Sequence, residues 1–394
     1  MFHFKEQIVA ELNQLATKGL LKSERILESP QGTEIMVSGK KVINFCSNNY
    51  LGLANDAQVI TAAKKALEQW GYGLASVRFI CGTQKIHQQL EKKLSRFLNL
   101  EETILYSSAF DANGGFFEVM AAADDVIISD ALNHASIIDG IRLSKAERKI
   151  FQHLDYDDLA AKLADSQDKR RKIIATDGVF SMDGDIADLK TICDLAEKHQ
   201  ALVMVDDAHA TGFMGERGRG TPEYCQAMDR VDIITGTLGK ALGGGNGGFI
   251  SGPKEIINLL RQRSRPYLFS NSLVPMITAT SLEILNILEH SDDARHKLLD
   301  NTQYFRKKIA QLGFTIKGDN HPIVPVMLYD AKLAQQMAKD LLAEDIYVIG
   351  FSYPVVPEGQ ARIRVQISAA HTQEQLQTAL TAFKKIGQKY QLIS

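Results

Sequence analysis

The sequence predicts an α/β protein, with a large and mostly parallel β-sheet flanked by helices and a smaller α+β domain at the C-terminal end. Between about residues 55 and 280, short and continuous apolar runs alternate with helical segments. Such runs are typical of parallel strands that helices bury on both faces. The C-terminal part changes character, and its strands look antiparallel. With 394 residues, the chain is long enough for two or more structural units.

The segment before the predicted sheet is expected to hold one helix and two short strands. The helix extends from the start to about Arg25, because apolar residues recur on one helical face. The strands lie on either side of a turn at Ser38-Gly39. The apolar residues of the helix are Ile8, Leu12 and Leu15, and the two strands are predicted at 34–37 and 41–45.

In the central part, four apolar runs predict buried strands and one periodic segment predicts a buried helix. Ligands of parallel sheets bind at the carboxyl ends of the strands, so the polar residues after each run are the candidates for a site. The helix is indicated by Leu90, Leu94, Phe97 and Leu98, and the strands by 126–128, 173–175, 202–205 and 233–234.

The C-terminal part is expected to combine two strands, 322–328 and 362–367, with two helices, 332–344 and 372–385. Three units follow from this pattern: residues 1–54 with the first helix and short strands, residues 55–285 with the large sheet, and residues 286–394 with the α+β domain.

Charge and composition exclude several classes of protein. Lys plus Arg number 45 and Asp plus Glu 47, so the chain lacks the positive charge of a nucleic-acid-binding protein. No stretch approaches the roughly 20 apolar residues that cross a membrane. Glu6 and Glu11 near the start argue against a targeting presequence, so a cytoplasmic protein is expected.

The cysteines are scattered and form no C-x-x-C pair, so neither a disulfide framework nor a zinc or other metal site is expected. Buried, reduced thiols are predicted instead. The cysteines are Cys46, Cys81, Cys193 and Cys225.

Polar residues follow three of the predicted strands. One strand leads into Asp206-Asp207-Ala208-His209, a second leads through Gly239 to Lys240, and a third leads into residues 176–184. An apolar setting disfavours the ammonium form of a lysine and frees its amine to form a Schiff base. Flanking glycines alone would not distinguish Lys240 from a surface lysine.

The combination of lysine and acid points to pyridoxal phosphate. That cofactor needs an acid against its pyridinium nitrogen, and Asp206 lies 34 residues before Lys240, a span that one crossover can bridge. His209 could reach the ring hydroxyl. Alternation along a strand sends Asp206 and Asp207 to opposite sides, so only one of the two can face the ring.

Several motifs together carry a family resemblance. V-x-V-D-D-A-H followed by T-x-x-K-A-x-G-G-G-x-G-G resembles the fold-type I pyridoxal-phosphate enzymes, and specifically the α-oxoamine synthases. Six further blocks over nearly the whole chain agree: N-F-C-S-N-N-Y-L-G-L, A-S-V-R-F-I-C-G-T, S-D-A-L-N-H-A-S-I-I-D-G, D-G-V-F-S-M-D-G, R-S-R-P-Y-L-F-S-N-S and Q-A-R-I-R-V-Q-I-S-A-A-H-T.

The resemblance implies a role for each catalytic residue. Lys240 would be the Schiff-base lysine and would move the α-proton of the amino acid. Asp206 would pair with the pyridinium nitrogen, and His209 would hydrogen-bond the ring hydroxyl. His134 would stack on the ring, and Ser181 would lie beside the ring hydroxyl and the substrate.

The resemblance also implies the phosphate site. The backbone N–H groups of Ala109 and Phe110 would begin a helix there, which suits an anion, and Thr237 would add a hydroxyl. Ser270 and Asn271 would come from the partner subunit, which implies a homodimer with shared active sites.

The implied reaction joins glycine to acetyl-CoA, giving 2-amino-3-oxobutyrate and CoA, or runs backwards in threonine breakdown. Arg364 would bind the glycine carboxylate with two parallel hydrogen bonds, assisted by Asn48, with His134 and Ser181 also beside the substrate. Arg362 would share the face of the same strand, so the residues alone leave both arginines open; the resemblance favours Arg364.

Three alternatives stay open at this point. One is another oxoamine synthase, like 8-amino-7-oxononanoate synthase, that uses alanine and a longer acyl-CoA. The second is an aminotransferase, which would normally place an aromatic residue where His134 is expected. The third is a non-catalytic partner subunit or a regulator, although such chains tend to lose the lysine or to carry a DNA-binding arm.

Overall fold

Seven strands form the main sheet of the protein, which the computed structural model describes over residues 3–18, 20–22 and 24–394. Every strand runs in one direction except β9, which is antiparallel to both of its neighbours, β3 and β8. Across the sheet the order is β3 (Glu102–Tyr106), β9 (Gly248–Gly252), β8 (Ile233–Thr237), β7 (Leu202–Asp206), β6 (Lys172–Asp177), β4 (Val126–Asp130) and β5 (Glu147–Phe151).

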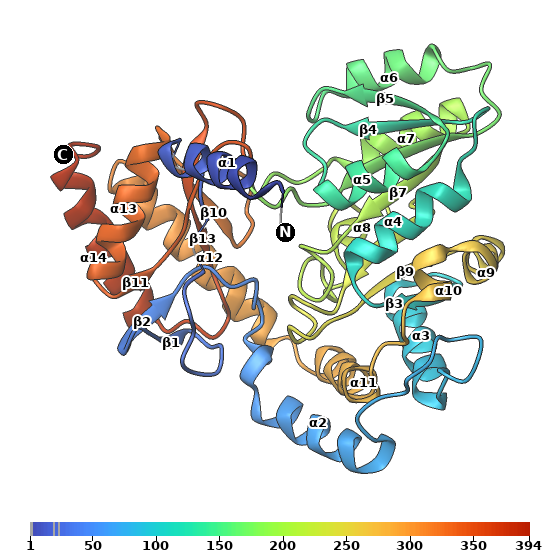
Figure 1. The fold of residues 1–394 in the computed structure, drawn as a ribbon, viewed down its shortest axis with the longest axis horizontal. Coiled ribbons are helices and arrows are strands. Elements are labelled where there is room, and N and C mark those ends of the chain that lie inside the picture. Colours follow the sequence, from blue (N-terminus) through green and yellow to red (C-terminus); the bar gives the residue numbers. More distant parts are fainter. Residues whose placement is uncertain (1–2, 19, 23) are drawn as a thin grey trace.

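Helices cover both faces of this sheet (Figure 1). Successive strand residues enter different cores: Ile174 packs with one helical layer and Ile173 with the other. The first layer contains α3 (Lys85–Leu98), α6 (Tyr156–Ala164), α7 (Leu189–His199) and α11 (Pro275–His290). The second contains α4 (Ala109–Met120), α5 (Ala135–Leu143), α9 (Lys254–Arg263) and α10 (Arg265–Phe269). Burial on both faces explains why the strands read as continuous apolar runs.

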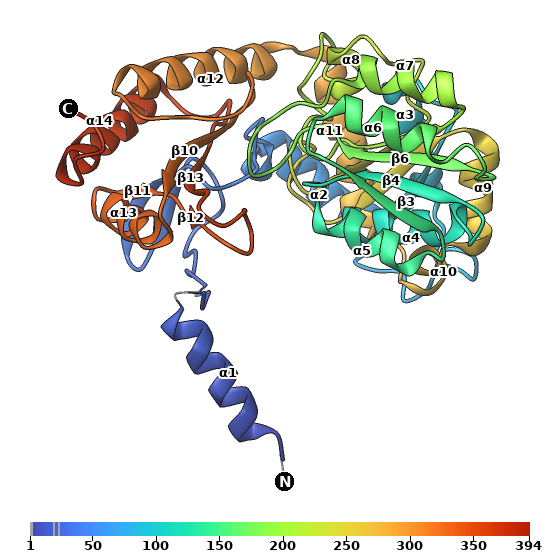
Figure 2. The ribbon, with the colours of Figure 1, turned by 90° about the horizontal axis from the view of Figure 1, so that it is seen from above.

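Two small sheets form a second lobe (Figure 2). One contains β1 (Glu34–Val37), β2 (Lys40–Asn44) and β11 (Ile346–Tyr347); the other contains β10 (Ile323–Tyr329), β13 (Ala361–Gln366) and β12 (Gly350–Phe351). The helix α12 (Asp293–Gln311) runs from the main lobe to this one, where α13 (Ala331–Ala343) and α14 (Gln373–Lys389) also lie. The first two strands thus join C-terminal elements.

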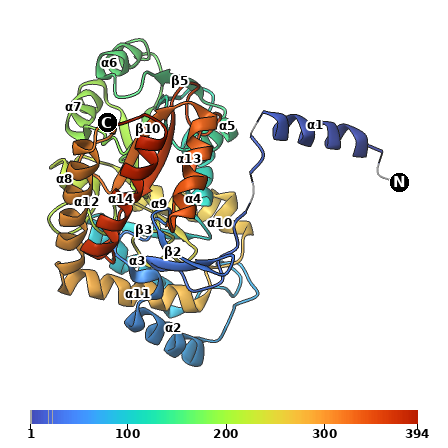
Figure 3. The ribbon, with the colours of Figure 1, turned by 90° about the vertical axis from the view of Figure 1, so that its left-hand side faces the viewer.

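The remaining helices are α1 (Lys5–Thr17), η1 (Leu53–Asn55), α2 (Ala57–Trp70) and α8 (Thr221–Tyr224). Figure 3 shows α1 projecting from the body of the molecule, and no residue of α1 is buried.

The predicted fold class is confirmed, and the four predicted strands are β4, β6, β7 and β8. The prediction that the first helix reaches Arg25 is wrong, because α1 ends at Thr17. Most helical stability in proteins comes from packing of an apolar face, and α1 buries none of its residues. Residues 19 and 23 of that predicted helix lie outside the described residues. The boundary near residue 285 stays a prediction; α11 ends at His290 and α12 begins at Asp293.

Two further findings bear on the composition arguments. The prediction of buried thiols is wrong for Cys81, which is exposed, and holds fully only for Cys193. In the part of the chain that the structure describes, no helix is both long and apolar enough to cross a membrane.

Candidate active site

The carboxyl ends of three neighbouring strands bring the predicted residues together. In the register of β6, β7 and β8, Asp177 lies opposite Asp206, and Asp206 lies opposite Thr235. Lys240 follows β8 by three residues. The loop that carries it is closed at its neck, because Thr237 pairs with Gly248 and the N–H of Leu238 donates to the carbonyl of Gly247 at 2.9 Å.

Asp206 and Asp207 face different surroundings. Asp206 accepts hydrogen bonds from the side chain of Asn113 at 2.6 Å and from the N–H of Ala208 at 3.0 Å. Asp207 accepts from the hydroxyls of Thr211 at 2.6 Å and Thr221 at 2.5 Å. Burial raises the pKa of Asp207 to about 7, against these hydrogen bonds. Asp207 therefore braces the loop after β7, and Asp206 is the acid near Lys240.

Lys240 is half-buried, and its side chain has a lowered pKa. Burial lowers its pKa to about 8, although the carboxylates of Asp206 and Asp177 act in the opposite direction. Among the residues that the structure describes, none forms a hydrogen bond or ion pair with Lys240 Nζ. A neutral amine at this position is a nucleophile and a base.

His134 is the N-cap of α5, and its ring lies near the same groups. Its Nδ1 lies 2.7 Å from the Ser136 hydroxyl, and its backbone N–H donates to Asp177 at 2.7 Å. Burial and the charge of Lys240 lower the pKa of His134, while the charge of Asp206 opposes them. His134 is thus held as a neutral ring beside the lysine and the acid.

His209 is held by two aromatic residues. Its Nδ1 lies 2.8 Å from the hydroxyl of Tyr50, and its carbonyl accepts from His321 at 2.8 Å. Burial and the charge of Lys240 place the pKa of His209 well below its usual range. A buried, neutral imidazole can donate a hydrogen bond to a ligand without carrying charge.

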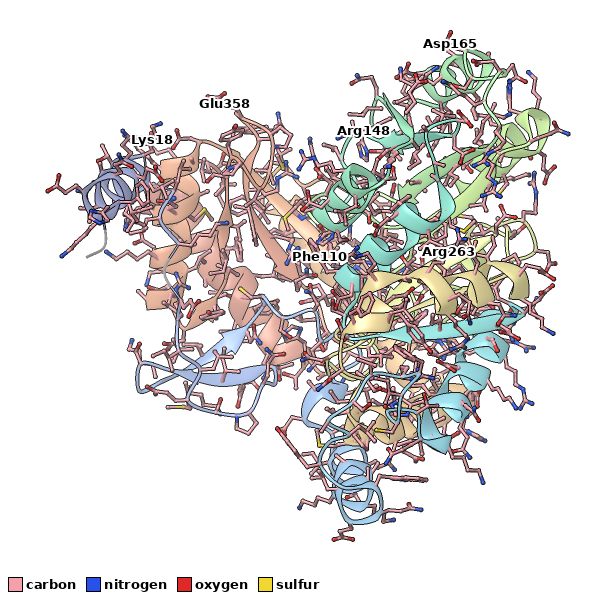
Figure 4. The ribbon with its side chains drawn as sticks, turned by 45° about the vertical axis from the view of Figure 1, so that its right-hand side comes forward. Lys18, Phe110, Arg148, Asp165, Arg263 and Glu358 are labelled. Atoms are coloured by element: carbon pink, nitrogen blue, oxygen red, sulfur yellow. The ribbon has the colours of Figure 1, made fainter. Side chains whose placement is uncertain are left out.

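An anion could bind where α4 begins. Ser108 caps this helix by accepting from the N–H of Asp111 at 3.0 Å. The N–H groups of Ala109 and Phe110 have no acceptor among the described residues, as is usual at a helix start. Only glycine fits at position 248, since a Cβ there would lie 2.4 Å from the backbone of Ser108 and Ala109. Figure 4 shows Phe110 at this end of α4.

The two candidate arginines differ in what they contact. Arg362 is almost fully buried, forms an ion pair with Asp183 and donates to the carbonyl of Gln360 at 2.9 Å. Arg364 has no carboxylate partner in the described chain; it donates to the carbonyl of Ser181 at 2.8 Å and stacks over Phe351. Arg364 is therefore the arginine whose charge remains available for an anionic substrate.

Asn48 reaches Arg364 through Gln366. One amide position of Gln366 lies 2.9 Å from Asn48 Oδ1 and 3.2 Å from Arg364 Nε. With the Gln366 oxygen in that position, it accepts from the guanidinium, and the Asn48 amide then turns its nitrogen toward Gln366, because two amide oxygens cannot share a hydrogen bond. The predicted substrate residues Asn48, Ser181 and Arg364 thus lie in one connected group.

The remaining predicted residues lie at the edge of the site. Thr237 accepts from the N–H of Gly239 at 3.0 Å, at the start of the lysine loop. The carbonyl of Asn271 accepts from Ser107 at 3.4 Å, so the segment with Ser270 passes close to the start of α4. A role for Ser270 and Asn271 in a neighbouring subunit stays a prediction.

Several residues of this site have no predicted role, although Tyr50, Ser136 and Gln366 lie in blocks that carry the family resemblance. Asn113, Ser136, Tyr50 and Gln366 contact predicted residues through side-chain hydrogen bonds. Asp177 ends β6 and begins the block D-G-V-F-S-M-D-G, but nothing in the sequence pairs it with His134. Its position at the carboxyl end of a buried strand is the physical signal that indicates it.

The fold and these residues define a family. The model of the aminotransferase class I and II family matches residues 40–383. The chain belongs to that family and, within it, to the α-oxoamine synthases.

Several individual proteins are similar to this chain over nearly its whole length. The chain is 56% identical over 394 residues to 2-amino-3-ketobutyrate coenzyme A ligase of Escherichia coli K12, covering 99% of each chain. It is 54% identical to the human mitochondrial enzyme of that name, covering 96% of this chain and 90% of the other. It is also 50% identical to 8-amino-7-oxononanoate synthase of Thermosipho melanesiensis, covering 97% and 98%.

Solved structures agree with the fold. Serine palmitoyltransferase of Sphingomonas wittichii superposes with a TM-score of 0.92 at 32% identity, covering 100% of this chain and 99% of that one. A serine palmitoyltransferase from S. paucimobilis that carries a pyridoxal-phosphate adduct of myriocin has a TM-score of 0.94 at 32% identity, with both chains fully covered.

Proposed function

We propose that this chain is a glycine C-acetyltransferase that joins glycine to acetyl-CoA and also catalyses the reverse cleavage. In the forward direction a C–C bond forms between the glycine α-carbon and the acetyl carbonyl carbon. The thioester C–S bond breaks, one α-proton leaves, and CoA departs as the protonated thiol. The product is 2-amino-3-oxobutyrate. The identity of 56% over the whole chain to the E. coli ligase carries this proposal.

Pyridoxal 5'-phosphate is the cofactor of this enzyme, and the residues present suit it. The site has an amine at Lys240, an acid at Asp206 and unpaired N–H groups at the start of α4. Gly248, which has no side chain, leaves room for a phosphate to approach these N–H groups. When bound, the cofactor supplies an electron sink for the charge left at the α-carbon.

The chain's own residues would hold and move the protons. Asp206, oriented by two hydrogen bonds that it accepts, would keep a proton on the ring nitrogen. Lys240, with a pKa near 8, would accept the α-proton. Arg364 would orient the glycine carboxylate, and neutral His134 and His209 would contact the ring. These assignments are proposals that rest on the geometry above.

An oxoamine synthase that uses alanine and a longer acyl-CoA is the second candidate. The T. melanesiensis relative favours it, because 50% identity is close to 56%. The two activities share the residues described above, so substrate assays must separate them. We expect kcat/KM for acetyl-CoA, with glycine saturating, to exceed that for succinyl-CoA and palmitoyl-CoA. A preference for either longer substrate, or for alanine, would select the second candidate.

The cofactor assignment has its own experiment. The purified protein should be yellow, and borohydride should abolish the visible band and leave a pyridoxyl group on Lys240 in peptide mass spectra. Lys240→Ala should retain some cofactor non-covalently and lose turnover by several orders of magnitude, because nucleophile and base disappear together. A pyridoxyl group on another lysine would refute the assignment.

Assembly and location are also proposals. A homodimer with shared sites is supported by the exposed segment at Phe269, next to Ser270 and Asn271, where an apolar side chain is 70% exposed. A cytoplasmic location is supported by four cysteines that are free in the structure, which suits a reducing compartment.

A further inference from the structure

One buried amide connects the acid and the histidine of the site. Asn113 lies in α4 and is fully buried. Its Nδ2 donates to Asp206 Oδ2 at 2.6 Å and to Ser136 Oγ at 2.8 Å. An amide nitrogen has two hydrogens, so both are used. A carboxylate only accepts, so the nitrogen and not the oxygen of Asn113 must face Asp206.

The other end of this amide is without a partner. Asn113 Oδ1 is buried and has no hydrogen bond among the residues that the structure describes. A buried acceptor without a partner destabilises a fold, and such groups are rare in proteins. The residue is therefore better explained by what its nitrogen does than by packing.

The direction of the next hydrogen bond follows. Ser136 Oγ accepts from Asn113, so its single hydrogen is free to point at His134 Nδ1, which lies 2.7 Å away. The N–H of Ser136 donates to the same nitrogen at 3.3 Å. A ring nitrogen that accepts carries no proton, so the proton of neutral His134 lies on Nε2.

We propose that Asn113 is a positioning residue that, through one series of hydrogen bonds, holds the Asp206 carboxyl group in its orientation and keeps His134 in its Nε2–H form. The inference rests on the proposed function, in which both residues face the cofactor ring. Asn113 itself touches neither cofactor nor substrate in this proposal.

The charged groups around His134 do not determine which ring nitrogen carries the proton, so the hydrogen bonds from Asn113 through Ser136 determine it. Asp177 faces its backbone from the end of β6, while Asp206, Lys240 and His209 face its ring from β7 and the two loops that follow β7 and β8. Asp206 favours a charged ring, and Lys240 and burial oppose it. None of these groups selects between Nδ1 and Nε2, whereas the hydroxyl and the backbone N–H of Ser136 both favour a proton on Nε2.

The test replaces the donor by an acceptor of the same shape. In the holoenzyme of Asn113→Asp, Asp206 loses the hydrogen bond that Asn113 donates, and a second carboxyl group faces it instead. The pH midpoint of the cofactor's visible band should then rise by about 1 unit, and the dissociation constant of pyridoxal phosphate should rise about tenfold. Both are read by titration and not by turnover.

A matched control comes from α12. Asn301 is also buried, and its Nδ2 also donates twice, to the carbonyls of Ser368 and His371 at 3.0 Å each. Asn301→Asp should lower Tm and leave the midpoint of the visible band unchanged. The proposal is overturned if Asn113→Asp titrates like the wild type, or if Asn301→Asp shifts the band equally.

A second pair of variants tests the proposal independently if Asn113→Asp does not fold. Ser136→Ala removes the hydroxyl at 2.7 Å and leaves only the longer backbone N–H contact at 3.3 Å, so the acid limb of the pH profile of kcat/KM should move up by about 1 unit, because Nδ1 is then more easily protonated. Ser136→Thr keeps the hydroxyl and should restore the wild-type profile. An unchanged Ser136→Ala profile overturns the proposal. A wild type that shows no visible band with pyridoxal phosphate would instead defeat the proposed function.

Discussion

At the scale of single residues, the adjacent Asp206 and Asp207 have different contacts and different expected roles. Asp206 contacts Asn113 and influences Lys240, whereas Asp207 is tied to Thr211 and Thr221. We expect Asp206→Asn to lower turnover by about 10³-fold, a loss of about 4 kcal/mol, because the amide cannot hold a proton on the ring nitrogen. Asp207→Asn should change turnover little. Steady-state kinetics of both variants, with cofactor saturating, tests this prediction. A large loss of turnover in Asp207→Asn with a small loss in Asp206→Asn would show that Asp207 contacts the ring.

The arginines of β13 give a second matched pair. Arg364 has a free guanidinium face, and lysine cannot reproduce two parallel hydrogen bonds to a carboxylate. Arg364→Lys should therefore raise the KM for glycine by at least about tenfold and leave the yellow colour intact. Arg362→Lys should mainly lower Tm, because Arg362 is committed to Asp183. Equal effects of both variants on the glycine KM would contradict this assignment.

The sequence could indicate Lys240, Asp206 and His209, because each follows a buried apolar run within a few residues. It could not choose between Asp206 and Asp207 from alternation alone, nor between Arg362 and Arg364. Those choices depend on partners such as Asn113 and Asp183, which are far away in the chain. Long-range polar contacts leave no periodic trace in a sequence.

At the scale of elements, His153 joins two strand ends. Its ring lies 2.9 Å from Asp130, at the end of β4, and 3.3 Å from Asp185, in the loop after β6. Burial alone would lower the pKa of His153, but the hydrogen bonds to these carboxylates raise it to about 9. In the unfolded chain a histidine titrates near about 6.5.

This difference makes a prediction for stability. Because the folded pKa is the higher one, the stabilisation by His153 is fully present below about pH 6.5 and is lost as the pH rises through about 9. His153→Gln should therefore lower the free energy of unfolding by about 1–3 kcal/mol near pH 6 and by much less near pH 10. Urea unfolding at both pH values measures it. The exposed His296→Gln serves as the control, and a deficit independent of pH would argue against the ion pairs.

The elements that the sequence missed have physical explanations. Both β5 and β9 lack a continuous apolar run: β5 is an edge strand with charged, exposed residues, and β9 is bounded by glycines. The predicted strands β4, β6, β7 and β8 each contain a continuous apolar run, whereas β3 is missing from the prediction although four of its five residues are buried. The reversed direction of β9 could not be inferred, since nothing in its sequence distinguishes antiparallel from parallel pairing.

At the scale of the whole molecule, the proposed sharing of sites predicts complementation. A chain with Lys240→Ala and a chain with both Ser270→Ala and Asn271→Ala should each be inactive. Refolded together, they should form mixed dimers in which one of the two sites is complete, so about a quarter of the wild-type activity should return. Activity assays after mixing measure this. No recovery, with dimers shown by light scattering, would mean that each subunit builds its site alone.

The reversed strand β9 gives the lysine loop an unusual attachment. A loop after a parallel strand leaves its sheet and returns through a helix, so only one end of it is fixed nearby. Here residues 238–247 begin and end at paired positions of adjacent strands, Thr237 and Gly248. Both ends of the backbone segment that carries Lys240 are thus fixed to the sheet, which would hold the side chain near one place in its proposed roles as attachment point and base. We expect one residue inserted between 238 and 247 to displace the Lys240 amine, because both ends of this segment are fixed, and a displacement of about 1 Å can abolish a reaction that depends on close approach.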